Sequence, residues 1–124
     1  MKTVFYWSPC LTKVGTVKST INSAIALSNY SSEQYKVKVI NTCGEWNLYR
    51  EIFKQNNIDL IEFKFKFFSY LPKNGFLSSR FSYLIIILFS FFPLISILKK
   101  DKPDFFIMHL LTSLPLILNN LFNL

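Results

Sequence analysis

Short apolar runs alternate with helical segments over the first half of the chain. Thr3–Trp7 has the β-branched and aromatic composition of a buried strand. Lys36–Asn41 alternates and then turns apolar, which predicts a second strand, and Ile58–Phe63 is a third strand candidate. Between them, Thr16–Asn29 has apolar residues at helical spacing. Leu48–Gln55 is a shorter helix candidate that Asn47 can cap, with Ile52 and Phe53 facing inward. Two strand–helix units with short loops predict an α/β fold, in which helices cover a parallel sheet.

A fourth strand candidate, Phe105–Met108, is wholly apolar, which predicts a strand buried on both faces. His109 ends this run, and Thr112 suits the start of a final apolar helix at about Leu114–Leu124. Ligands of open α/β sheets bind outside the carboxyl ends of the strands, so His109 is a candidate catalytic residue. The structural alternative is a half-buried histidine bonded to a carbonyl group, which is the more frequent fate of an isolated histidine.

The segment Phe81–Leu98 is almost uninterrupted apolar sequence, with Arg80 before it and Lys99 and Lys100 after it. Three interpretations remain open: a buried helix of a soluble domain, a helix in the membrane interface, or a true transmembrane span. A span needs roughly 20 mainly apolar residues, so the length weighs against it. The density of Lys and Phe over Lys64–Arg80 favours contact with an anionic bilayer.

The chain has 124 residues, enough for one domain, and a formal net charge of +7. Such a charge favours anionic partners. No nucleic-acid motif is present, and the Phe residues lie mainly in apolar runs, so we expect no nucleic-acid partner. Cys10 and Cys43 lack the spacing of metal ligands, so we expect no metal site. Their small number suits a reducing cytosol, although the sequence leaves a single disulfide open.

The first loop, Ser8–Gly15, follows a strand and opens a helix. Gly15 allows the backbone to approach a ligand closely, and a helix N-terminus, with Thr16 as a candidate cap, favours phosphate. An ordinary turn glycine explains Gly15 equally well, because the loop has neither GxGxxG nor a P-loop motif. Lys13 adds positive charge or is simply exposed. Glu45 follows the second strand and can accept a hydrogen bond from a substrate hydroxyl, although a surface carboxylate is the more frequent case.

The order of these elements resembles the N-terminal domain of the family-4 type glycosyltransferases, which have the GT-B fold of two Rossmann-like domains. The resemblance rests on three places in the chain: Ser8-Pro9 to Gly15-Thr16 with the helix to Ser28, the strand Lys36-Val-Lys-Val-Ile, and Lys102-Pro-Asp-Phe-Phe-Ile-Met-His109-Leu-Leu-Thr-Ser-Leu-Pro-Leu. The last is similar to the family's "kPDiihaH" strand and following helix. The likeness extends over most of residues 1–124.

The resemblance implies transfer of a sugar from a nucleotide-sugar to a lipid-linked or polysaccharide acceptor, without a metal cofactor. Gly15 would lie near the donor diphosphate and His109 near the transferred sugar. Val14 stands where the family often has a second glycine. Residues 1–124 resemble only the N-terminal domain, so we expect an incomplete, Rossmann-like half of a GT-B fold that lacks the donor-binding C-terminal domain and is inactive alone.

The resemblance also implies a cytoplasmic protein at the inner face of the cell membrane, because Phe81–Leu98 is similar to the membrane-contact surface of the family's lipid-acceptor enzymes. The alternative is a small integral membrane protein with one transmembrane helix at Phe81–Leu98 and no enzymatic activity. That alternative explains the hydrophobicity but not the strand–helix alternation of residues 3–63.

Overall fold

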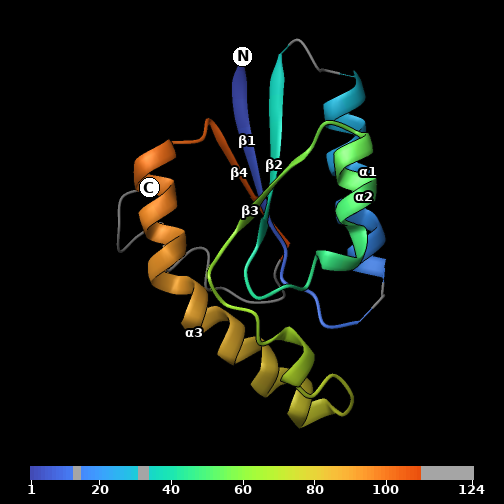
Figure 1. The fold of residues 1–124 in the computed structure, drawn as a ribbon, viewed down its shortest axis with the longest axis vertical. Helices are drawn as coiled ribbons and strands as arrows, with labels where there is room; N and C mark the ends of the chain where they lie inside the picture. Colours follow the sequence, from blue (N-terminus) through green and yellow to red (C-terminus); the bar gives the residue numbers. More distant parts are fainter. Residues whose placement is uncertain (13–14, 31–33, 110–124) are drawn as a thin grey trace.

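Four strands of the described part of the chain form one central sheet, and every strand pair in it is parallel. The computed structural model describes residues 1–12, 15–30 and 34–109. Within these ranges the sheet order is β3-β2-β1-β4 (Figure 1). The strands are β1 (Lys2–Trp7), β2 (Tyr35–Asn41), β3 (Asp59–Glu62) and β4 (Phe105–Met108). The predicted α/β class with a parallel sheet is therefore confirmed, and each strand lies within two residues of its predicted bounds.

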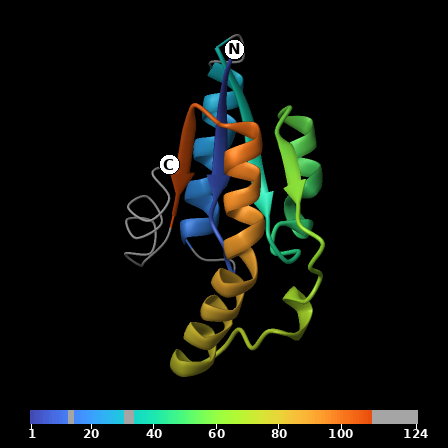
Figure 2. The same ribbon diagram turned by 90° about the vertical axis from the view of Figure 1, so that its left-hand side faces the viewer.

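The helices lie on both faces of this sheet. The first crossovers use α1 (Gly15–Tyr30) and α2 (Arg50–Gln55), which lie on one face, whereas α3 (Phe76–Asp101) covers the other (Figures 1 and 2). Two short 3-10 helices, η1 (Asn47–Tyr49) and η2 (Phe68–Tyr70), precede α2 and α3. The chain thus moves outward from β1 to β3, and α3 then carries it back to β4 on the far side of β1. The strand order reverses between β1 and β4.

Alternate residues of β1 face the two helical layers, as the two-residue period of a strand requires. Val4 and Tyr6 belong to the apolar cluster that includes Val17 of α1, whereas Phe5 and Trp7 pack in the cluster that includes Leu94 of α3. These four side chains of β1 are each at most 1% exposed. The central strand is therefore buried on both faces, and α3 is part of the hydrophobic core.

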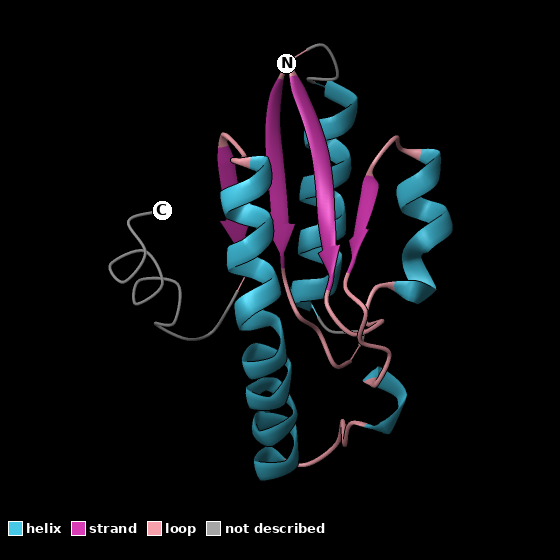
Figure 3. Ribbon diagram, turned by 60° about the vertical axis from the view of Figure 1, so that its left-hand side comes forward, coloured by secondary structure: helices cyan, strands magenta, loops and turns pink. Residues whose placement is uncertain are grey.

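The helix α3 is much longer than the strands that it covers. Its 26 residues make about 39 Å at 1.5 Å per residue, whereas the seven residues of β2 span about 23 Å. The first half of α3 therefore continues past the carboxyl ends of the strands (Figure 3). There Ile86 packs in a small cluster with Leu11, Cys43 and Leu71. The helix begins after Gly75, whose φ of 95° is rare for residues with side chains.

Three local predictions were wrong. Asn47 caps no helix: it lies inside η1, and α2 begins after Tyr49 without a side-chain cap. Ile52 is 40% exposed because the short α2 buries only Phe53. The strand β4 is not buried on both faces, since Phe105 is 46% exposed and the other three residues of β4 are only half-buried. Lys13 and the expected helix Leu114–Leu124 lie outside the described residues.

Candidate functional site

His109 lies at the point where the strand order reverses. It follows β4 directly, and its backbone N–H donates to the carbonyl oxygen of Trp7, 3.3 Å away, at the end of β1. Its ring stacks on that of Tyr6, with the centroids 6.3 Å apart and the planes at 23°. The imidazole is half-buried, and no described residue hydrogen-bonds to its ring nitrogens. The structure thus places His109 at the carboxyl edge of β1 and β4, the position that the sequence predicts.

The start of α1 is tied to the same end of β1. The Thr20 hydroxyl donates to the Thr16 carbonyl oxygen at 2.9 Å and lies 3.0 Å from the Ser8 hydroxyl oxygen. Ser8, the residue that follows β1, is only 2% exposed. Gly15 is the first residue of α1, and no described atom lies within 4 Å of the position that a Cβ would occupy there. Packing among the described residues therefore gives no reason for a glycine at this position.

Glu45 is a buried carboxylate, and each of its two oxygens already accepts a hydrogen bond from the backbone. Its side chain turns back on its own loop, where Oε1 accepts from the backbone N–H of Thr42 at 2.9 Å and Oε2 accepts from that of Cys43 at 2.8 Å. The residue is 2% exposed. The interpretation of Glu45 as an exposed carboxylate is therefore wrong. The backbone N–H groups of Thr42 and Cys43 are buried after the end of β2, and the Glu45 carboxylate supplies the acceptors that they require.

Two free thiols lie beside this carboxylate. Burial, and to a lesser extent the charge of Glu45, raises the pKa of Cys10 from 9.0 to about 12. Burial, followed by the charge of Glu45, also raises the pKa of the Cys43 thiol. Both cysteines are buried and neither is in a disulfide. Because only a thiolate is a good nucleophile, these thiols are inert near neutral pH.

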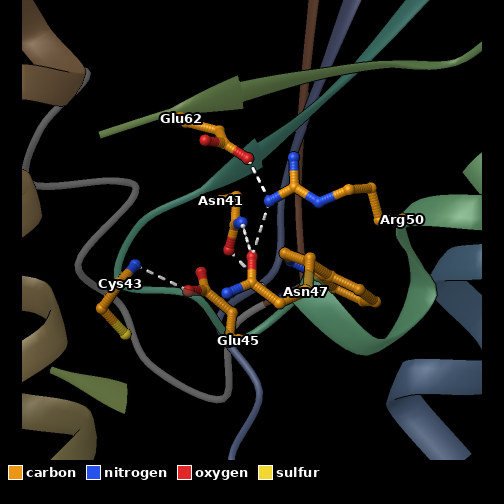
Figure 4. A network of polar contacts seen from close by, with 7 residues as sticks. Asn41, Cys43, Glu45, Asn47, Arg50 and Glu62 are labelled. Atoms are coloured by element: carbon orange, nitrogen blue, oxygen red, sulfur yellow. Dashed lines mark hydrogen bonds and ion pairs between the residues drawn. The ribbon is translucent and has the colours of Figure 1, made fainter. Parts of the chain in front are cut away.

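A polar network that the sequence did not predict follows β2 and β3 (Figure 4). The Asn47 side-chain oxygen accepts from Asn41 Nδ2 at 2.9 Å and from Arg50 Nη2 at 3.0 Å. Arg50 also forms an ion pair with Glu62, and the Asn41 side-chain oxygen accepts from the Trp46 backbone N–H. One signal was available in the sequence: Asn41 is a polar residue at the carboxyl end of a predicted strand.

This network borders a pocket of about 100 Å³. Gly44, whose φ is 104°, lies in its wall, and a Cβ there would come within 3.0 Å of Asn47 Nδ2. The pocket is much smaller than the roughly 300 to 1,000 Å³ of ordinary ligand sites. A larger hollow of about 420 Å³ lies beside Met1 and Tyr35, at the amino ends of the strands, which is the wrong edge for a ligand of a parallel sheet. The network alone therefore accommodates a small polar group, not a whole nucleotide.

One buried donor in this region has no acceptor. The indole N–H of Trp46 has no hydrogen-bond partner among the described residues, although the side chain is fully buried. Its ring packs edge-on against those of Tyr49 and Phe53, 5.7 and 5.6 Å away. Burial of an N–H group without an acceptor costs free energy, and the Trp46 indole N–H is the one buried side-chain donor without a partner among the described residues.

The described residues contain no group of three His, Cys, Asp or Glu side chains that could hold a metal ion, and the absence of a metal cofactor stays a prediction. The chain matches no known protein-family description, no curated protein and no solved structure. The strand order and the residues at the carboxyl edge are therefore the observations that bear on function.

Proposed function

We propose that this chain is the acceptor-side, Rossmann-like part of a sugar transferase of the GT-B type. The strand order carries the proposal. The order β3-β2-β1-β4 equals the first four strands of the doubly wound order 3-2-1-4-5-6, in which the ligand crevice lies where the order reverses. The start of α1 and His109 flank that reversal on either side of the end of β1.

The residues of this edge have distinct proposed roles. The N-terminus of α1 would face the donor diphosphate, because the partial positive charge of a helix N-terminus attracts phosphate and Gly15 leaves its approach open. His109 would line the cleft beside the transferred sugar and hydrogen-bond to it through a ring nitrogen. Thr16 and Lys13 would add a hydroxyl and a positive charge beside the diphosphate. Glu45 would act only by holding the loop after β2, since both of its oxygens bind backbone N–H groups.

Sugar transfer in such a cleft depends on positioning and on charge stabilisation from both sides. A separate domain would supply the residues that hold the nucleotide-sugar. We therefore expect the 124-residue chain alone to bind a nucleotide-sugar weakly and to transfer no sugar. A lipid-linked or polysaccharide precursor would be the acceptor.

The histidine provides a direct test, because His109 is the only one in the chain. Millimolar UDP- and GDP-hexoses are added to the protein while the His109 ring signals are followed by NMR. We expect one of these donors to shift the signals of the unmodified chain. Gly15→Val should abolish the shift, since its side chain fills the open space. The control is Ala26→Val, which also introduces a valine in α1 but at an exposed position. This variant should show the same NMR shift as the unmodified chain.

Two results would contradict the proposal. The first is the absence of a shift with every donor, and the second is an equal shift in the Gly15→Val protein. Radiolabelled sugar transfer to lipid extracts, measured with the chain alone, tests the need for a second domain. Turnover by the isolated chain would show that it is a complete enzyme rather than half of one.

The second candidate function, a small protein with one transmembrane span, is favoured by one observation. Helix α3 is long and apolar enough to cross a membrane, with a mean hydropathy of 2.4 over its best 18 residues. However, Leu94 and Leu98 of α3 pack against the sheet and are 0% and 6% exposed. A spanning α3 would have to leave this core, so we favour the folded α/β domain.

A further inference from the structure

The outward face of α3 carries a continuous apolar stripe. The stripe consists of Leu77, Phe81, Leu84, Leu88 and Phe92, which lie at helical spacings of three or four residues and are 51 to 78% exposed. Residues on the opposite side of the same helix, such as Ile86 and Leu94, are completely buried. Soluble monomers rarely leave a contiguous apolar surface of this kind uncovered, so the stripe indicates an interaction site.

The charge around the stripe has one sign. No Asp or Glu occurs between Phe63 and Lys100, whereas this segment contains the basic residues Lys64, Lys66, Lys73, Arg80, Lys99 and Lys100. Arg80 borders the stripe, because it lies three residues after Leu77 and four before Leu84 in α3. Its guanidinium lies over the ring of Phe76, 4.0 Å from the centroid. Lys73 lies over the ring of Phe68 at 4.3 Å, in the segment that leads into α3. A surface that is both apolar and basic is complementary to an anionic lipid bilayer.

The structure also limits how deeply this surface can enter a bilayer. Ile86 contacts the loops after β1 and β2, and the last turns of α3 cover the sheet. Phe65 and Phe67 pack against Phe89, with ring centroids 5.3 and 5.1 Å apart, so protein partly covers another flank of the helix, although Phe89 itself is 49% exposed. Only one side of α3 can therefore contact lipid while the domain stays folded, which is the geometry of an interfacial helix.

We propose that α3 binds an anionic membrane surface with its stripe, lying in the plane of the interface without crossing the bilayer. The stripe inserts at the boundary of headgroups and acyl chains, and Arg80 and Lys73 contact lipid phosphates. This inference is independent of sugar transfer, because it depends only on the exposed face and charge of α3.

Flotation with lipid vesicles tests the proposal on the full 124-residue chain. Vesicles of phosphatidylcholine with phosphatidylglycerol are compared with vesicles of phosphatidylcholine alone, at low and high salt. We expect binding to the anionic vesicles, weakened by salt. The double variant Phe81→Ser/Leu88→Ser should lower vesicle affinity at least about tenfold, since it removes two large apolar side chains from the interface. The control Tyr30→Ser/Leu48→Ser changes two side chains on α1 and η1 that are 91% and 74% exposed, and should bind normally.

Circular dichroism must show that both double variants fold, which is expected because all four side chains are exposed. Equal affinity of the two double variants for anionic vesicles would overturn the proposal. Equal affinity of the unmodified chain for anionic and neutral vesicles would also overturn it. Resistance of the bound protein to alkaline extraction would overturn it in favour of a span. A dimer in the absence of vesicles that Phe81→Ser/Leu88→Ser dissociates would overturn it in favour of a second copy of the chain.

Discussion

Replacement of Glu45 by Gln tests whether this buried carboxylate is structural. The change keeps the size of the side chain but leaves one oxygen where the structure uses two. Oε1 and Oε2 now accept from the N–H groups of Thr42 and Cys43 at 2.9 and 2.8 Å. In the Glu45→Gln protein one of these buried N–H groups would face the amide NH₂ of the new side chain, and two donors cannot pair.

The expected size of the effect follows from these contacts. A hydrogen bond to a charged group contributes roughly 1.5 to 3 kcal/mol, and a buried donor without an acceptor costs a similar amount. One bond is lost and the other becomes neutral, so we expect Glu45→Gln to lower the free energy of unfolding by about 2 to 4 kcal/mol. Urea denaturation at pH 7, followed by circular dichroism, measures this difference.

Glu51→Gln is the matched control, because Glu51 is exposed in the first turn of α2 and its loss should cost less than about 0.5 kcal/mol. If Glu45→Gln were as stable as Glu51→Gln, the two backbone bonds would contribute nothing and Glu45 would be available for another role. A large loss in Glu45→Gln alone would assign this residue to the architecture of the loop.

Two further predictions concern the core. Leu94→Ala should destabilise the fold by about 2 to 5 kcal/mol in urea denaturation, because Leu94 is fully buried between α3 and the sheet, whereas Leu84→Ala on the exposed face should cost less than about 1 kcal/mol. Equal effects would mean that α3 is not packed on the sheet. Stability should fall as the pH rises from about 9 towards 12, because the raised pKa of Cys10 makes the unfolded chain lose its thiol proton first. Cys10→Ala should reduce this slope in the urea midpoint, and an unchanged slope would assign it to other groups.

The sequence predicted local structure well because strand and helix periodicity are local signals. The alternation over residues 3–63 predicted helices α1 and α2 and a parallel sheet, and the apolar run before His109 predicted strand β4. The strand order was not predictable in the same way, because nothing within β4 specifies that it pairs with β1. That pairing depends on α3 crossing back over the sheet, which is a property of the whole chain.

The polar residues were less predictable than the apolar ones. Glu45 was expected to bind substrate and Asn47 to cap a helix. Instead, Glu45 accepts hydrogen bonds from two backbone N–H groups of its loop, and Asn47 accepts one from the Asn41 side chain. These contacts depend on the path of the folded backbone. Gly15 and His109, by contrast, lie at the predicted edge, because the ends of strands fix their positions. Sequence reasoning therefore located the edge of the sheet but not the hydrogen bonds within it.

The length of α3 connects the candidate site with the candidate membrane surface. In a parallel α/β unit the helix runs antiparallel to the strands, so α3 begins at their carboxyl edge and returns towards their amino edge. A helix of about 39 Å over strands of about 23 Å must therefore extend past the sheet at one end. The last turns of α3 are packed, so its excess length projects past the carboxyl edge of the sheet (Figure 3). His109 lies at the same edge, where its backbone N–H donates to the Trp7 carbonyl oxygen at the end of β1. A bilayer bound to the stripe would thus lie near the edge where the proposed cleft opens. A lipid-linked acceptor could reach that cleft while its lipid tail stays in the membrane, so the two proposals are compatible although each is tested separately.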